Sequence, residues 1–233
     1  MIIEIKNLTK TISGNTVLSN INLSMETGTI YGLKGKNGSG KTMLMRAISG
    51  LISPTEGEVI IDGKILGKDI SFPESIGLLI ENPAFLPTYS GFDNLKMIAS
   101  IKRIITDEDI RNIIKRVGLD PDDKKKYKKY SLGMKQKLGI ACAVMEKPDV
   151  IILDEPINAI DEDGVKVIRE LLDELKREDK VIILACHDKE ELYYLSDEII
   201  EIDAGKIKRQ FKIDKSNIQS LDNAACEEDA DEE

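Results

Sequence analysis

The chain has 233 residues and a formal net charge of −9 at neutral pH. That length is enough to bury a sizeable core and predicts one large α/β domain. No apolar run reaches the roughly 18 residues that a membrane-spanning helix needs, so the chain is not expected to form a pore itself. Three widely spaced cysteines without CxxC spacing indicate neither a disulfide framework nor a zinc site.

Short apolar strands are predicted near the start of the chain, at residues 2–5, 16–24 and 59–61. The third is followed by Asp62 and Gly63, a pair that is typical of tight hairpin turns. We expect these strands to form an antiparallel sheet that covers one end of the domain.

Residues 35–42 read GKNGSGKT, a spacing that predicts a pocket for the phosphates of a nucleotide. Its glycines let the backbone adopt positive φ angles, so that successive N–H groups can point at an anion. A short apolar strand at 29–33 leads into this loop and a helix at 42–51 follows it, which places the phosphates at a helix N-terminus. Lys41 would meet the β- and γ-phosphates of ATP, and the Thr42 hydroxyl would bind Mg²⁺. The expected nucleotide-binding residues of this phosphate loop are Gly35, Lys36, Asn37, Gly38, Ser39, Gly40, Lys41 and Thr42.

Residues 85–136 show the spacing of apolar side chains that indicates helices, with breaks at Gly118 and Pro121. We expect an inserted helical subdomain of about this extent. Within it, residues 124–129 (KKKYKK) form a basic run, for which a solvated loop and a weak contact with lipid headgroups both remain open. One aromatic residue and a slightly acidic body do not make a nucleic-acid groove, so no nucleic-acid partner is expected.

Residues 149–156 (DVIILDEP) place two acids directly after four apolar residues. This pattern predicts a buried parallel strand that delivers Asp154 and Glu155 to its carboxyl end, where α/β sheets bind ligands. Asp154 would hold the Mg²⁺ and Glu155 would polarise the attacking water. Another apolar strand is predicted at 181–185, and His187, the only histidine, follows it. Together with strands near 30 and 200, these strands should form a parallel sheet.

The ordered motifs resemble those of the ATP-binding cassette (ABC) family. The stretch at 130–137 (YSLGMKQK) keeps the serine and second glycine of the family's signature as Ser131 and Gly133, while a plain N-cap at Ser131 would give the same local structure. Asp161 matches the aspartate of the family's dimer-contact loop, and His187 matches its switch histidine. Residues 196–199 and 205–207 complete a resemblance that covers about residues 1–210.

The resemblance implies a P-loop NTPase cassette with a RecA-like parallel-sheet core, an antiparallel β subdomain and the inserted helical subdomain. It also implies catalysis by Glu155, Lys41 and His187, with Ser131, Gly133 and Asp161 acting across the contact with a second ATP-binding subunit. That second subunit could be identical or different. An integral membrane permease would be the other partner, and it would hold this cytoplasmic chain on the inner face of the cell membrane.

Two positions depart from the family pattern. Ile12 stands where family members carry an aromatic residue that stacks on adenine, so we expect adenine to lie on Ile12 and Val17 with weak base discrimination. Glu81 replaces the family's loop glutamine, and as a carboxylate it would be a catalytic group and a strong ligand for Mg²⁺. With Pro83 and Phe85, this glutamate resembles the bacitracin-resistance and lantibiotic-immunity branch of exporters.

The predicted function is therefore ATP hydrolysis that powers a separate membrane subunit, with export of an antimicrobial peptide or a similar amphipathic compound. The alternative from another class is an ABC ATPase of DNA repair, chromosome organisation or translation, which would show long heptad arms, zinc cysteines or two cassettes. A GTPase would show an Asn-Lys-x-Asp motif, and this sequence has none. We expect residues 1–212 to form the ATP-binding domain and residues 213–233, with seven acids in the segment LDNAACEEDADEE, to be a disordered tail.

Overall fold

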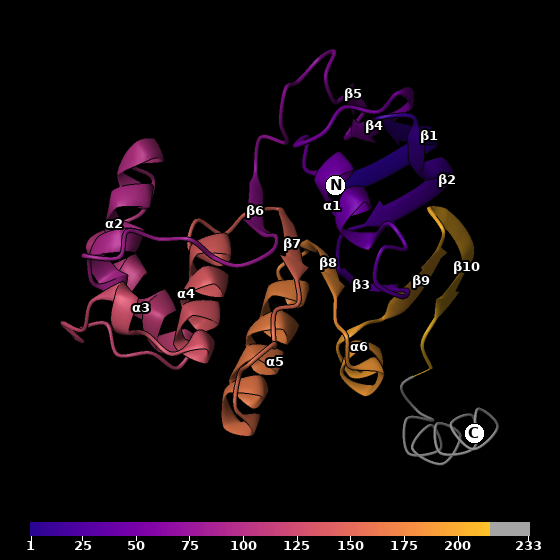
Figure 1. Cartoon of the computed structure of the whole chain (residues 1–233). Helices are drawn as coiled ribbons and strands as arrows, with labels where there is room; N and C mark the ends of the chain where they lie inside the picture. The colour runs from indigo at the N-terminus through magenta and orange to yellow at the C-terminus, as the bar shows by residue number, and fades with distance from the viewer. Residues whose placement is uncertain (215–233) are drawn as a thin grey trace, which may run out of the picture.

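The computed structural model describes residues 1–214, which form two β-sheets with helices packed around them (Figure 1). The smaller sheet is antiparallel with the strand order β2-β1-β4-β5. Its strands are β1 (Ile2–Ile12), β2 (Asn15–Glu26), β4 (Glu56–Ile61) and β5 (Lys64–Ile65). The three strands predicted from the sequence all belong to it, although β1 and β2 run further than their apolar residues indicate.

The larger sheet has the strand order β10-β9-β3-β8-β7-β6. Five strands are mutually parallel, and β10 runs antiparallel to β9 at one edge. The strands are β3 (Thr29–Lys34), β6 (Ile76–Leu79), β7 (Val150–Asp154), β8 (Val181–Ala185), β9 (Glu198–Asp203) and β10 (Lys206–Lys212). The predicted parallel core is thus present, with two further edge strands that the sequence did not indicate.

Side-chain alternation along the buried strands divides the core into two layers. On β8, Ile182 faces one layer and Ile183 faces the other, because successive residues of a strand point to opposite sides of the sheet. Both side chains are fully buried. This explains why β7 and β8 are continuous apolar runs: a parallel sheet covered on both faces has no solvent-facing side.

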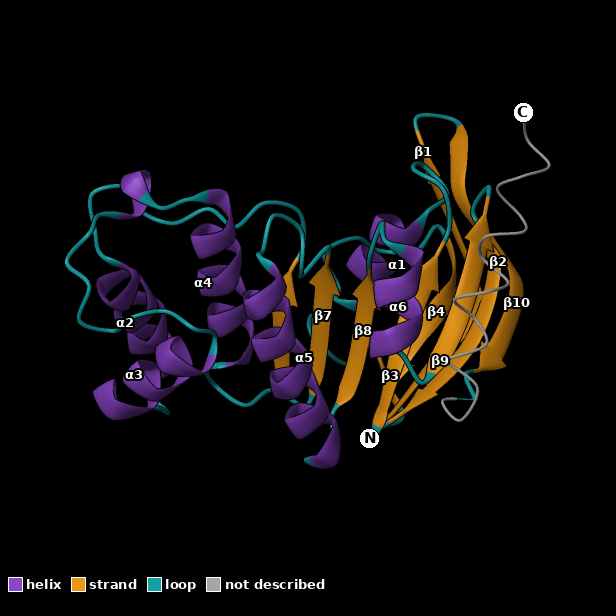
Figure 2. Ribbon diagram, turned by 90° about the horizontal axis from the view of Figure 1, so that it is seen from below, coloured by secondary structure: helices purple, strands orange, loops and turns teal. Residues whose placement is uncertain are grey.

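One layer contains α1 (Lys41–Ile48), which packs between the two sheets through Leu44, Met45 and Ile48. The other layer is covered by α4 (Leu132–Val144), α5 (Glu162–Arg177) and α6 (Lys189–Leu195), as Figure 2 shows. None of the helices in the described part of the chain has the length and hydropathy of a membrane span.

Between β6 and β7 the chain forms α2 (Gly91–Lys102), α3 (Asp107–Arg116) and a short 3₁₀ helix, η1 (Tyr127–Lys129). Capping boxes begin α2 and α3, with Ser90 and Thr106 as the N-cap residues. These helices pack against α4 at the side of the molecule away from the antiparallel sheet (Figure 1). The predicted helical insertion is therefore present in this part of the chain. The basic run is not entirely solvent-exposed, since Tyr127 is buried and its hydroxyl donates to the Pro83 carbonyl at 2.6 Å.

Three features differ from the sequence prediction for physical reasons. Strand β6 is short and lies where a loop was expected, and its Gly77 is required because a side chain there would overlap the Ala143 carbonyl on α4. Strand β10 is mostly polar because it is an edge strand. Ile213, in the predicted tail, packs against the core and donates its N–H to the Asp197 carbonyl at 2.8 Å. The rest of the predicted disordered tail, residues 215–233, lies outside the described residues.

Candidate nucleotide-binding site

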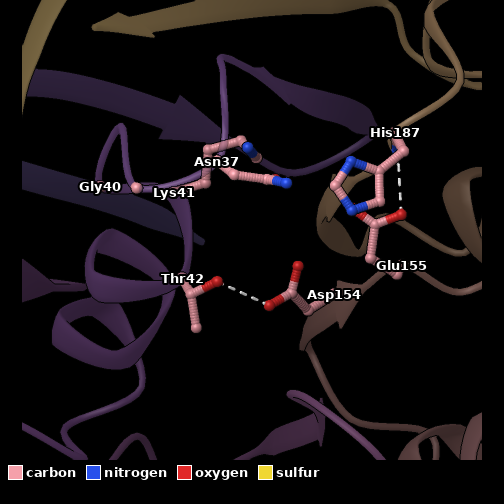
Figure 3. A pocket seen from close by; sticks show the side chains of 8 residues that line it. Asn37, Gly40, Lys41, Thr42, Asp154, Glu155 and His187 are labelled. Carbon is pink, nitrogen blue, oxygen red and sulfur yellow. Dashed lines mark hydrogen bonds and ion pairs between the residues drawn. The ribbon is translucent and has the colours of Figure 1, made fainter. Parts of the chain in front are cut away.

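The phosphate loop, β7 and the segment after β8 meet around one cavity of about 230 Å³ at the carboxyl edge of the parallel sheet. Figure 3 shows Asn37 and Lys41 on one side of this space, with Glu155 and His187 on the other and Asp154 near Thr42. Parallel strands deliver these residues together because their carboxyl ends lie at the same edge. The lining residues are Asn37, Gly38, Gly40, Lys41, Thr42, Asp154, Glu155 and His187.

The phosphate loop has the backbone geometry of an anion site. Gly38 and Gly40 have φ angles of 77° and 112°, which residues with a side chain rarely adopt. Gly40 is the N-cap of α1 and provides no side-chain cap, so the first-turn N–H groups remain for another acceptor. The Lys41 ammonium is held inside the loop, where it donates to the carbonyls of Gly35 at 2.5 Å and Lys36 at 3.2 Å. This arrangement suits a ligand with several negative oxygens.

Thr42 and Asp154 bring two oxygen ligands together at the base of the cavity. The Thr42 hydroxyl donates to Asp154 Oδ2 at 2.8 Å, and Asp154 is buried. Hydroxyl and carboxylate oxygens suit Mg²⁺, which usually keeps some waters and takes substrate phosphates as further ligands. Within residues 1–214, no group of three or more acids, histidines or cysteines could hold a metal. Two protein oxygens would leave the other positions of an octahedral Mg²⁺ to water and phosphate oxygens.

Both carboxylate oxygens of Glu155 lie close to His187. Oxygen Oε2 accepts the backbone N–H of His187 at 2.9 Å, and Oε1 lies 3.6 Å from His187 Nε2. Burial raises the pKa of the Glu155 carboxyl, while the His187 N–H and the His187 ring oppose this shift. The His187 ring is 62% exposed and faces the cavity from the segment after β8, so it is not a core histidine (Figure 3).

Gln136 is a residue near the site for which the sequence indicated no role. It lies on α4, it is buried, and its side-chain amide donates to the Glu155 carbonyl at 2.6 Å. Glu155 has a φ of 55°, an unfavourable conformation for a residue with a side chain, and its N–H is fixed by the Ala185 carbonyl at 2.9 Å. Hydrogen bonds therefore fix both the N–H and the carbonyl of Glu155, the residue with the unfavourable φ. Little in the sequence indicated this contact, because Gln136 lies between Lys135 and Lys137 in the polar first half of α4.

The signature residues lie outside this cavity. Ser131 is the N-cap of α4, and its hydroxyl accepts the Met134 N–H at 3.2 Å. Gly133 packs against the loop after β7, because a Cβ there would lie 2.6 Å from the Ala159 carbonyl oxygen. Asp161 begins α5 and pairs with Lys137 of α4 at 3.3 Å, which lowers the Asp161 pKa. Their predicted contacts with a second subunit remain predictions.

Glu81, Ile12 and Val17 also lie outside the cavity lining. The Glu81 carboxylate forms an ion pair with Arg46 of α1, and its side chain is 63% exposed. Ile12 is 42% exposed beside the turn that joins β1 to β2. Val17 is nearer the phosphate loop, since its carbonyl oxygen lies 3.1 Å from the position of a Cβ on Gly40. The structure therefore does not bring Glu81 to the predicted metal ligands, and its metal role stays a prediction.

A phosphate loop between β3 and α1, opposite two acids at the end of β7, defines the chain as a P-loop nucleoside triphosphatase. Residues 18–158 match a family model described as ABC transporter. The chain belongs to the family of ABC transporter ATP-binding proteins, and proteins of this family are ATPases that power transport.

Three curated relatives give the comparison more detail. The chain is 52% identical over 211 residues to the uncharacterized ABC transporter ATP-binding protein YybJ of Bacillus subtilis, covering 91% of this chain and 97% of the relative. It is 35% identical to the lantibiotic transport ATP-binding protein SrtF of Streptococcus pyogenes, with coverages of 95% and 96%. It is 36% identical to the bacitracin transport ATP-binding protein BcrA of Enterococcus faecalis, with coverages of 91% and 70%.

Solved structures agree on the fold. A bacterial ABC transporter cassette solved as a dimer is similar with a TM-score of 0.82 and 25% identity, covering 91% of this chain and 99% of that one. The protein cbiO1 of Clostridium perfringens, part of an ABC transporter complex, has a TM-score of 0.78 and 27% identity, with coverages of 95% and 90%. The predicted fold class and family are confirmed.

Proposed function

We propose that this chain hydrolyses ATP to power the export of an antimicrobial peptide or a similar amphipathic compound. The observation that carries the hydrolytic part is the cavity in which Lys41 and the acids Asp154 and Glu155 face one another. The relatives named for lantibiotic and bacitracin transport support the choice of cargo. Membership of the family does not specify the transported compound, so a transport experiment has to test whether it is a peptide.

The role proposed for each residue rests on its position around the cavity. The loop N–H groups and Lys41 neutralise charge on the β- and γ-phosphates as it develops. Glu155 lies at the opposite wall, where its carboxylate can accept a proton from a water that attacks the γ-phosphate. His187 donates its backbone N–H to Glu155 and its ring is exposed at the cavity, which supports a role for the ring in aligning the γ-phosphate. The proposed nucleotide-binding residues also include three further members of the phosphate loop, Gly35, Lys36 and Ser39.

Mg²⁺ is the proposed metal. Thr42 and Asp154 would supply two of its oxygen ligands, and bound Mg²⁺ would neutralise phosphate charge. We further propose that Ser131, Gly133 and Asp161 complete the ATP site of a second subunit, since all three lie outside this chain's own cavity. A permease subunit would hold the pair on the inner face of the membrane.

The test is peptide resistance in cells that carry the native locus with single substitutions in this chain. Lys41→Ala removes the ammonium that meets the phosphates, so resistance to bacitracin and to a lantibiotic should fall to the level of a deletion. Lys115 is exposed on α3, and Lys115→Ala is the matched control that should retain full resistance. If Lys41→Ala abolishes ATPase activity but leaves resistance to both peptides unchanged, the proposed cargo is wrong while the ATPase assignment stands.

A further inference from the structure

A second and larger cavity, of about 810 Å³, adjoins the nucleotide site. It lies between the phosphate loop, α6 and the strands β9 and β10, and it shares Asn37 and His187 with the first cavity. We call it the basic groove, because five cationic side chains line it and only two acids do. The cations are Lys34, Lys36, Lys189, Lys208 and Arg209, and the acids are Glu201 and Asp203.

The two acids of the basic groove are already paired. Glu201 forms ion pairs with Lys34, at 3.7 Å, and with Arg209. Asp203 pairs with Lys208 at 3.3 Å. Among residues 1–214, Lys36 and Lys189 pair with no acid, and both are exposed. The groove is therefore a positive surface on a chain whose net charge is −9, and it suits a polyanionic occupant.

We infer that the occupant is the acidic segment of this same chain, residues 221–233, which contains seven acids and no base. The described part of the chain ends at residue 214, two residues after β10, the strand that carries Lys208 and Arg209. Returning from residue 214 to the level of Arg209 takes about 17 Å at the rise of a strand. Residues 215–226 span up to ~40 Å when extended, so the acidic segment reaches the groove with length to spare.

An acidic segment in the basic groove would lie against Asn37 and His187, which also line the nucleotide cavity. It would compete electrostatically with a triphosphate for the positive charge of this wall. Docking would therefore restrain ATP hydrolysis at low salt. Because exposed charges are screened within ~3 Å at 1 M salt, the restraint should disappear in concentrated salt.

Cys226 lies inside the acidic segment and reports docking directly in the full-length chain. Lys208→Cys places a thiol in the groove, and mild oxidation should form an intrachain disulfide with Cys226. Cys186 also lines the groove and Cys142 is half-buried on α4, so both cross-linking variants carry Cys142→Ala and Cys186→Ala, which leaves Cys226 as the one native thiol in the sequence. Lys212→Cys is the matched control, because it is exposed on the same strand, outside the groove and closer to Cys226 in sequence.

Docking predicts faster cross-linking from position 208 than from position 212, whereas random collision predicts the reverse because shorter loops close more readily. Replacing the seven acids by their amides should remove the preference for position 208 while keeping the tail length. Equal or slower cross-linking at position 208, or a disulfide that forms between chains, would overturn the proposal.

The kinetic test uses the same amide-substituted tail with all native cysteines. ATP turnover by this variant should exceed that of the natural chain by about fivefold at ~0.1 M salt, the low end of typical coupling between two sites. The two rates should converge at ~1 M salt. A variant with the same turnover as the natural chain at low salt would contradict the restraint. Peptide transport is not needed for either readout, so its failure would leave this inference intact.

Discussion

At the scale of single residues, Arg46 forms an ion pair with Glu81, the residue that replaces the family's loop glutamine. This ion pair changes what the glutamate is expected to do. The pair joins α1 to the segment after β6, and Glu81 has a φ of 62° there. Both side chains are partly exposed, so the pair should contribute little to the stability of the fold. The ion pair instead affects the position of the Glu81 carboxylate, which the sequence predicts as a ligand of Mg²⁺, because Arg46 binds this carboxylate outside the cavity lining.

Substitutions at both ends of this pair test whether Glu81 reaches the metal. Arg46→Met frees the carboxylate while keeping the length of the side chain, so the Mg²⁺ concentration for half-maximal ATPase rate should fall. Glu81→Gln should raise it. The measurement is a Mg²⁺ titration of ATP turnover, with Lys64→Met at the exposed Lys64–Glu74 pair as the control. If neither Arg46→Met nor Glu81→Gln moves the titration midpoint, Glu81 is a surface acid with no part in metal binding.

Most of the residues around the cavity could be predicted from the sequence, because they belong to short contiguous motifs. All the lining residues except His187 belong to two short motifs, residues 35–42 and 149–156, whose spacing indicates their chemistry. His187 was expected from the family resemblance and from its place after a predicted strand, and parallel strands bring it to the same edge as Asp154. Gln136 and Arg46 could not be predicted in this way. Their partners, Glu155 and Glu81, are distant in sequence, and no periodicity encodes which side chain meets which backbone atom across a fold.

At the level of elements, helix α4 connects the signature segment to the Glu155 peptide through Gln136. Gln136→Leu keeps the buried volume and leaves the Glu155 carbonyl without its donor, a loss that costs about 1–3 kcal/mol. If the strained peptide then relaxes away from the catalytic position, kcat should fall on the order of tenfold or more. ATP affinity should change little, because Gln136 does not line the cavity.

The matched control for this substitution is Gln210→Leu on β10, where the side-chain amide donates to Glu198 at 2.8 Å on the surface. It should leave kcat and ATP affinity unchanged. Single-turnover ATP hydrolysis separates the two parameters for Gln136→Leu. Loss of ATP binding with unchanged kcat would show that Gln136 supports the phosphate loop rather than the Glu155 peptide.

Helix α2 begins with a capping box whose stability should depend on pH. Ser90 Oγ donates to Asp93 at 2.6 Å, and this hydrogen bond lowers the pKa of the Asp93 carboxyl. A pKa lower in the folded state than in the unfolded state means that the ionised form stabilises the fold. The stabilisation is complete above the unfolded pKa and is lost as pH falls through the folded pKa.

Asp93→Ala should therefore lower the free energy of unfolding by about 0.3–1 kcal/mol at neutral pH, the usual contribution of an acid in the first turn of a helix. The difference from the natural chain should vanish in acid, below the lowered pKa of Asp93. Denaturant unfolding at a series of pH values measures both quantities. Asp173→Ala on α5, where no capping box involves the residue, is the matched control for removing an exposed aspartate from a helix. A constant difference at all pH values would exclude ionisation of Asp93 as the cause.

The elements themselves differed in how well the sequence predicted them. The buried strands β7 and β8 are strongly apolar, and α3 carries apolar residues at helical spacing, so for these elements the composition and the period of the sequence agree. Strand β6 has four residues and includes Gly77, which is weak evidence for a strand when considered alone. It exists because pairing with β7 and the close approach of α4 stabilise it, and such tertiary effects have no local signal.

At the scale of the whole molecule, the two layers around the parallel sheet place the phosphate-binding residues on one side of the cavity and the acids and the histidine on the other. Helix α1 lies in one layer and carries Lys41 and Thr42 at its start. Strands β7 and β8 end at Asp154 and just before His187, on the opposite wall. The signature segment at the start of α4 lies outside this cavity, so a complete site in the proposed mechanism needs a second subunit.

Glu155→Gln tests that whole-molecule arrangement. The amide keeps the shape of the side chain and can still contact the His187 backbone, but it cannot accept a proton from water. ATP should therefore bind without turnover, and a second subunit held by the bound ATP should persist. Light scattering after gel filtration with ATP and Mg²⁺ should give twice the monomer mass for Glu155→Gln, and the monomer mass when Lys41→Ala is added. Near-normal ATP turnover by Glu155→Gln would assign the base to another group, whereas a non-hydrolysing monomer saturated with ATP would contradict the two-subunit site.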